Sequence, residues 1–187
     1  FVQDIYIVTP EPSLVKNVLA KIDISAKTIH MISDDKVLSE EELSLPGWVK
    51  QQIIKLKSYK ICDSEYILCI GADTVLRKQL LLSDFYENEK IIIHYRRHRQ
   101  LDGHYIFEQR RTENIYKLLG LGNIRNKQKH DYIFDVFMFN SDVLRKMELY
   151  VDKELGGYKT IYPHEIISFD DMVLMGEWSL YVIFVIE

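Results

Sequence analysis

Apolar residues along the chain fall into two kinds of pattern. Short continuous or alternating runs rich in β-branched and aromatic residues predict strands at 4–10, 27–33, 64–71, 90–95, 131–140 and 180–186. Apolar residues at helical spacing predict helices at 12–22, 46–59, 106–122 and 142–155, and in the first part of 162–178. The acidic segment 33–47 is typical of a solvated loop or a short helix.

Strands that alternate with helices indicate an α/β fold with a mostly parallel central sheet flanked by helices. The chain has 187 residues, so we expect residues 1–187 to form a single domain. Residues 66–71 carry no charge, which predicts a central parallel strand that is buried on both faces.

Composition narrows the function classes. The formal net charge of −4 argues against a general nucleic-acid binder. The longest apolar run, 180–186, is too short for a transmembrane segment. Two cysteines, Cys62 and Cys69, cannot form a disulfide framework for this length, so we expect both to be reduced. No secretory signal precedes Asp4, and we expect a cytoplasmic protein.

A lone carboxylate, Asp73, follows the uncharged run "YILCIG" of residues 66–71. Ligands of open α/β sheets bind outside the carboxyl ends of the strands, and a carboxylate there can hold a divalent metal together with substrate phosphates. The other interpretation is that Asp73 caps a helix starting near Val75. Both interpretations fit the residue types.

The segments "PGWVKQQIIKL" and "EYILCIGADTVL" resemble a bacterial glycosyltransferase-like family of the nucleotide-diphospho-sugar transferase type called GT-A. Members of that family show a helix of the form Gly-Trp-x-x-Gln-Gln-x-x-Lys-Leu, matched here by Gly47, Trp48, Gln51, Gln52, Lys55 and Leu56. Their next strand ends in Asp-x-Asp-Thr, matched by Gly71, Ala72, Asp73 and Thr74.

The resemblance implies a GT-A-like, Rossmann-like fold that transfers sugar from a nucleotide-diphospho-sugar donor to a glycan or polysaccharide acceptor. It implies Mn²⁺ or Mg²⁺ at Asp73, and donor contacts from Trp48, Gln51, Gln52, Lys55, Gly71, Ala72 and Asp73. The two glutamines also suit a solvated helix face. A peripheral position at the inner face of the membrane fits such an acceptor. Gly71 departs from the family pattern, because it stands where relatives have the first aspartate.

Three further groups are candidates. Arg96 and Arg97 follow a predicted strand and suit a diphosphate, although charge runs also form solvated loops. Asp170 and Asp171 lie in a segment that resembles the family's acidic motif, which makes Asp171 the candidate general base. The same pair also suits a helix N-cap before residues 172–175. Asp135, inside a predicted strand, is a further candidate.

A second function class is a non-catalytic relative that keeps the fold for binding or assembly, and Gly71 is the residue that supports it. A nucleotidyltransferase would need a glycine-rich, basic loop after the first strand, where the chain supplies only Lys16. No P-loop, nucleophile elbow or dinucleotide fingerprint is present, so the sequence does not support ATPase, hydrolase or dehydrogenase activity.

Overall fold

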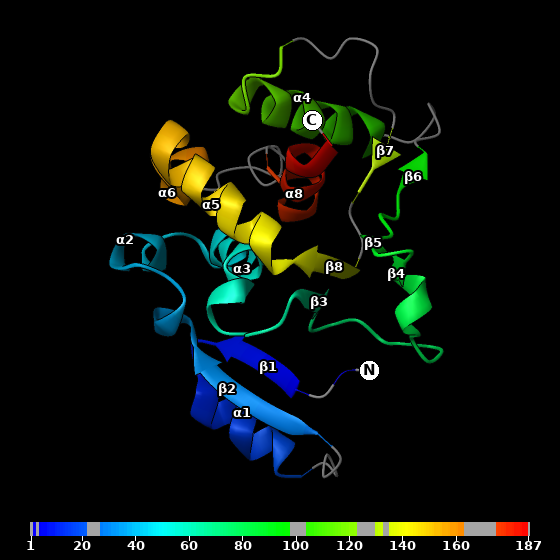
Figure 1. The fold of residues 1–187 in the computed structure, drawn as a ribbon. Helices are drawn as coiled ribbons and strands as arrows, with labels where there is room; N and C mark the ends of the chain where they lie inside the picture. Colours follow the sequence, from blue (N-terminus) through cyan, green and yellow to red (C-terminus); the bar gives the residue numbers. More distant parts are fainter. Residues whose placement is uncertain are drawn as a thin grey trace.

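The computed structural model describes residues 2, 4–21, 27–97, 104–122, 130–132, 135–162 and 175–186, and shows a mixed α/β fold (Figure 1). The α/β class expected from the sequence is confirmed at this level. No helix in these ranges is long and apolar enough to cross a lipid bilayer.

The first unit is a β-α-β motif. Strand β1 (Asp4–Thr9) is followed by helix α1 (Pro12–Leu19) and by strand β2 (Thr28–Ser33), which pairs with β1 in parallel. The connection through a helix allows this parallel pairing. The motif predicted for residues 4–33 is therefore confirmed. Leu14 and Val18 of α1 are exposed, and none of the three elements adds a side chain to the main apolar core.

Short helices lead from this motif to the core. They are η1 (Asp34–Lys36), α2 (Glu40–Leu43), α3 (Gly47–Leu56) and η2 (Ser58–Lys60). Ser39 begins α2 with a capping box, since its hydroxyl accepts from the Glu42 N–H and the Glu42 carboxylate accepts from the Ser39 N–H. Helix α3 buries Val49, Ile53 and Leu56.

Strand β3 (Tyr66–Ile70) pairs with β8 (Val136–Asn140), and the pairing is antiparallel. The prediction of a central parallel strand buried on both faces is therefore wrong. β3 is only partly buried, and Ile70 is exposed. Within the described ranges each sheet has two strands and only β1–β2 is parallel, so no large parallel sheet is seen. Apolar side chains alone do not determine strand direction, which depends on the partner strand.

The segment after β3 contains η3 (Leu82–Asp84) and short paired strands. β4 (Tyr86–Glu87) pairs with β5 (Lys90–Ile91), and β6 (Arg96–Arg97) pairs with β7 (His130–Asp131). The strand predicted at 90–95 is thus limited to Lys90–Ile91, because residues 92–95 are irregular.

Four helices complete the described chain: α4 (His104–Leu118), α5 (Ser141–Leu155), α6 (Tyr158–Ile161) and α8 (Glu177–Ile186). The strand predicted at 180–186 is wrong, because these residues lie in α8. A continuous apolar run does not distinguish a buried strand from a buried helix. All residues from Glu177 to Ile183 are buried, as expected for a helix that is apolar all round.

Helix α8 forms the centre of the core. It lies between α4 and α5 and against α3 and β8 (Figure 1). Trp178 stacks on Phe137 and Phe139 of β8, with ring centroids 5.1 and 5.2 Å apart. The hydroxyl of Tyr181 accepts a hydrogen bond from the Asn140 N–H at 2.9 Å. These contacts fix the last helix against the β3–β8 pair.

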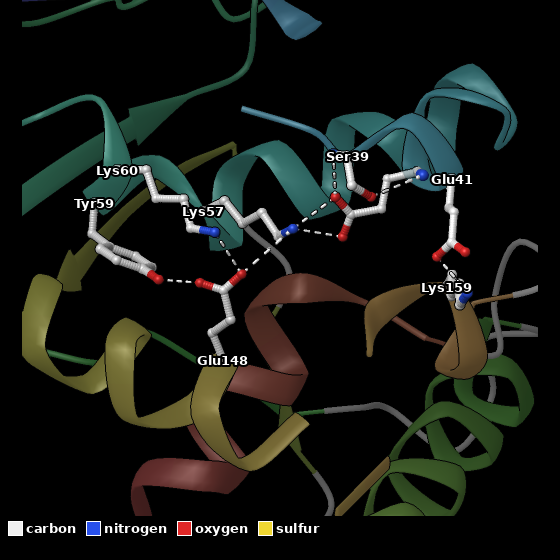
Figure 2. Close-up of polar contacts among 8 residues, drawn as sticks. Ser39, Glu41, Lys57, Tyr59, Lys60, Glu148 and Lys159 are labelled. Atoms are coloured by element: carbon white, nitrogen blue, oxygen red, sulfur yellow. Dashed lines mark hydrogen bonds and ion pairs between the residues drawn. The ribbon is translucent and has the colours of Figure 1, made fainter. Parts of the chain in front are cut away.

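A buried ion network joins α2, the segment after α3, and α5 (Figure 2). The Nζ atom of Lys57 lies 2.6 Å from both carboxylate oxygens of Glu42 and 3.4 Å from Glu148 Oε1. Lys60 Nζ lies 2.9 Å from Glu148 Oε1, and the Tyr59 hydroxyl donates to Glu148 Oε2. Two carboxylates are therefore balanced by two ammonium groups and one phenol.

Burial acts to raise the pKa of the Glu148 carboxyl. The hydrogen bonds from Tyr59 and Lys60 and the charge of Lys57 outweigh burial and lower this pKa below its ordinary value of 4.5. A carboxyl whose pKa is lowered by folding stabilises the folded state above its unfolded pKa, and this contribution is lost as the pH falls through the folded pKa.

We therefore expect Glu148→Gln to lower the free energy of unfolding at pH 7 by on the order of 3 kcal/mol, because the buried Lys57 loses a charged partner and the exposed Lys60 loses its contact with the same carboxylate. The difference from wild type should shrink as the pH falls below 4.5. Urea unfolding, monitored by tryptophan fluorescence at several pH values, measures the free energy of unfolding and its dependence on pH. Glu154→Gln, in the exposed pair with Lys153 on the same helix, should leave the unfolding midpoint unchanged. A pH-independent difference for Glu148→Gln would contradict this account.

Candidate functional site

Asp73 lies in a turn directly after β3. The Thr74 N–H donates to the Gly71 carbonyl at 3.0 Å and closes the turn, while the Gly71 N–H donates to the Asp135 carbonyl at 2.9 Å. Residues 74–81 form no helix, so the helix-cap interpretation of Asp73 is wrong. The turn is thus held from one side by the segment that leads into β8.

The Asp73 side chain is exposed. Its carboxylate has no hydrogen-bond or ion-pair partner among the described residues, and the same residues contain no group of three or more metal-ligating side chains. A single exposed carboxylate is a weak protein ligand by itself. It suits a hard cation that also receives oxygen ligands from a bound phosphate.

Gly71 fits closely against this turn. A Cβ at its position would lie 2.9 Å from Thr74 Oγ1 and 3.1 Å from Asp73 Oδ1. Any larger residue at 71 must therefore displace these two side chains. The absence of a side chain at Gly71 leaves the Asp73 carboxylate in its observed position.

Two residues of α3 face the start of α8. The Gln52 side chain is buried, and its Oε1 accepts from the Glu177 N–H at 3.1 Å. Lys55 Nζ lies 2.6 Å from Glu177 Oε1 and 4.6 Å from the centre of the Trp178 ring. The predicted donor-binding residues Gln52 and Lys55 are thus engaged with the protein itself.

Glu177 is only 3% exposed. Burial raises the pKa of its carboxyl, while the charge and hydrogen bond of Lys55 and the charge of Arg111 act in the opposite direction. Arg111 on α4 is buried and lies against Gly176, where a Cβ would be 3.0 Å from Arg111 Cδ. The start of α8 is therefore a buried polar cluster, defined here as Gln52, Lys55, Arg111 and Glu177.

The remaining predicted site residues are scattered. Trp48 is partly buried and packs against the core, whereas Gln51 and Ala72 are exposed. The backbones of Arg96 and Arg97 pair with β7, and their side chains lie outside the described residues. Asp170 and Asp171 also lie outside the described residues. Asp135 is exposed and precedes β8, so its prediction as a charge inside a strand is wrong.

Sequence reasoning missed Glu177 and Arg111. The signal for Glu177 was its place at the edge of the most apolar run, since a carboxylate there needs a partner if the run is buried. Arg111 lies in a helix with many charges and gave no distinguishing signal.

Residues 1–185 match the model of a family of unknown function, DUF6492. The chain belongs to the DUF6492 family. No curated protein matches it. The family match spans the Asp73 turn and the polar cluster of this DUF6492 chain, and it assigns no activity to either.

Cys69 lies in β3, close to the Lys55–Glu177 pair. Burial raises the pKa of its thiol to about 12, against the opposing effect of Lys55. Cys62 and Cys69 form no disulfide with each other in the structure.

We expect Cys69 to resist alkylation at pH 8 in the folded protein, because its thiolate fraction is on the order of 10⁻⁴ at that pH. A Cys62→Ser variant isolates Cys69, and intact-mass measurement after iodoacetamide treatment follows its modification. Labelling should become complete only after denaturation. Rapid labelling of the folded variant would contradict the raised pKa.

Proposed function

We propose that this protein is a metal-assisted glycosyltransferase that moves a sugar from a nucleotide-diphospho-sugar to a glycan or polysaccharide acceptor. The observation that carries the proposal is the exposed Asp73 carboxylate, which has no partner among the described residues. Asp73 follows β3 and matches the second aspartate of the Asp-x-Asp-Thr motif, for which the resemblance implies a metal ligand. The Gly-Trp-x-x-Gln-Gln-x-x-Lys-Leu match in α3 is the second support.

Glycosyl transfer leaves a nucleoside diphosphate with increased negative charge, which needs compensation. Bound Mn²⁺ or Mg²⁺ would supply this compensation as a Lewis acid. Asp73 fits such a cation because its oxygens are hard ligands and its exposure leaves room for phosphate oxygens. Because Gly71 has no side chain, a ligand can approach the backbone of the turn.

The other assignments extend this proposal. Asp171, with Asp170 beside it, is the proposed general base that takes the proton of the acceptor hydroxyl. Trp48, Gln51 and Ala72 are proposed to contact the donor, with Arg96 and Arg97 at its diphosphate. We also propose that the protein has a GT-A-like central sheet, which would be larger than the two-stranded pairs described above. The proposed location of the protein is the cytoplasm, at the inner face of the membrane.

We expect the wild-type protein to bind Mn²⁺ together with one member of a panel of UDP and GDP sugars. Asp73→Asn keeps the shape of the side chain but removes its charge. It should weaken this binding at least tenfold, about 1.4 kcal/mol. Isothermal titration calorimetry measures both affinities.

Asp63→Asn provides a matched control, because Asp63 is another exposed aspartate in the segment before β3. It should bind like wild type. Failure of every donor to bind in the presence of Mn²⁺ or Mg²⁺, or unchanged binding by Asp73→Asn, would remove the proposal.

A non-catalytic binding or assembly protein is the second candidate. Gly71 supports it, since the position that bears a carboxylate in the resembling family has no side chain here. The close contacts that a Cβ would make with Thr74 and Asp73 also show that the turn is built around glycine.

Gly71→Asp distinguishes the two candidates. If the wild type is a degenerate transferase, the added carboxylate should create metal-dependent hydrolysis or transfer of the donor sugar where the wild type has none. Gly71→Ala adds the same Cβ without the carboxylate, and it controls for the displacement of Thr74 and Asp73. Release of nucleoside diphosphate is the measurement. Turnover by the wild type would exclude the non-catalytic candidate.

A further inference from the structure

Helix α3 carries the densest part of the resemblance, yet two of its matched side chains face the interior. Gln52 is 4% exposed and its amide oxygen accepts from the Glu177 N–H. Lys55 pairs with the Glu177 carboxylate and covers the Trp178 ring. Both side chains therefore meet the same residue of α8 from the same face of α3.

This arrangement conflicts with a direct role of Lys55 at a diphosphate. The Lys55 side chain is 19% exposed and the Glu177 side chain 4%. If the ammonium moved to a ligand, the Glu177 carboxylate would stay buried without its nearest counter-charge, and such a loss is strongly unfavourable. Gln52 would likewise leave a buried N–H at the start of α8 without an acceptor.

The contacts continue from α8 to the Asp73 turn. Trp178 follows Glu177 and stacks on Phe137 and Phe139 of β8. β8 pairs with β3, and the Asp135 carbonyl, one residue before β8, holds the Gly71 N–H. Cys69 of β3 lies close to both Lys55 and Glu177. A series of contacts therefore runs from the polar cluster through Trp178 to the strand pair whose end forms the turn.

We propose that Gln52, Lys55 and Glu177 are positioning residues that act through Trp178 and the β3–β8 pair to hold the Asp73 turn. Lys55 and Gln52 do not contact the donor. Their catalytic consequence rests on the function proposed above, whereas their effect on the turn can be measured without any substrate.

The first test is hydrogen exchange of the Gly71 amide, followed by mass spectrometry of peptides from residues 66–75. Lys55→Met and Glu177→Gln should each raise the exchange rate at Gly71 at least fivefold, because the hydrogen bond to Asp135 opens more often. Lys55→Arg should restore slow exchange. Lys50→Met removes another lysine of α3, which pairs with Asp34 at 3.6 Å, and should leave Gly71 exchange unchanged.

The second test uses kinetics with the donor that binds. Lys55→Met and Glu177→Gln should each lower kcat/KM for the donor about tenfold, and by similar factors, because both loosen the turn that carries Asp73. The double variant should lose no more than either single variant, since both remove one interaction. Gln52→Met keeps the side-chain volume and replaces Lys55→Met if that variant does not fold. It should lower kcat/KM for the donor by a similar factor.

The outcomes separate the two proposals. Unchanged Gly71 exchange in Lys55→Met, Gln52→Met and Glu177→Gln overturns the positioning role, whatever the activity. A tenfold rise in donor KM for Lys55→Met, with Glu177→Gln like wild type, also overturns it and makes Lys55 a donor contact. Raised Gly71 exchange in a protein that binds no donor supports the positioning role and removes the transferase proposal.

Discussion

The burial of α8 is the constraint on which the rest of the structure depends. Seven consecutive residues, Glu177–Ile183, are buried, and elements from both halves of the chain cover them. The first of these residues carries a carboxylate. A buried carboxylate is stable only with counter-charges and hydrogen bonds, and α3 supplies Lys55 and Gln52 to this one. The apolar core and the polar cluster are therefore parts of one packing arrangement.

The buried charges and the exposed carboxylate have different roles. Lys57, Glu42 and Glu148 compensate one another between α2 and α5, and Lys55 with Arg111 compensates Glu177. These groups hold helices that are far apart in the sequence. Asp73 has no such partner among the described residues and faces the solvent. A charged side chain without an ion-pair partner in the protein is available to a ligand. For this reason the proposed function is centred on Asp73.

Membership of the DUF6492 family extends over nearly the whole chain but brings no assigned chemistry. The proposed transferase activity therefore depends on the α3 and Asp73 motifs and on the exposure of the turn. The structure changes the meaning of the first motif, because Gln52 and Lys55 face Glu177 rather than the surface. Residues of a motif that suggests a ligand contact can instead be required for the packing of two helices.

Local pattern predicted the β1-α1-β2 unit, helices α3, α4 and α5, and the strands β3 and β8, because their periodicity and breakers depend on nearby residues. It failed where a distant partner decides the outcome. Residues 180–186 form a helix that packs against α3, α4, α5 and β8, and β3 runs antiparallel to β8, a strand that is distant in the sequence. The sequence by itself determined that a carboxylate follows β3. Only the tertiary structure decided that this carboxylate is exposed while Lys55 and Gln52 are buried against Glu177, because burial and charge compensation depend on segments that meet only in the folded chain.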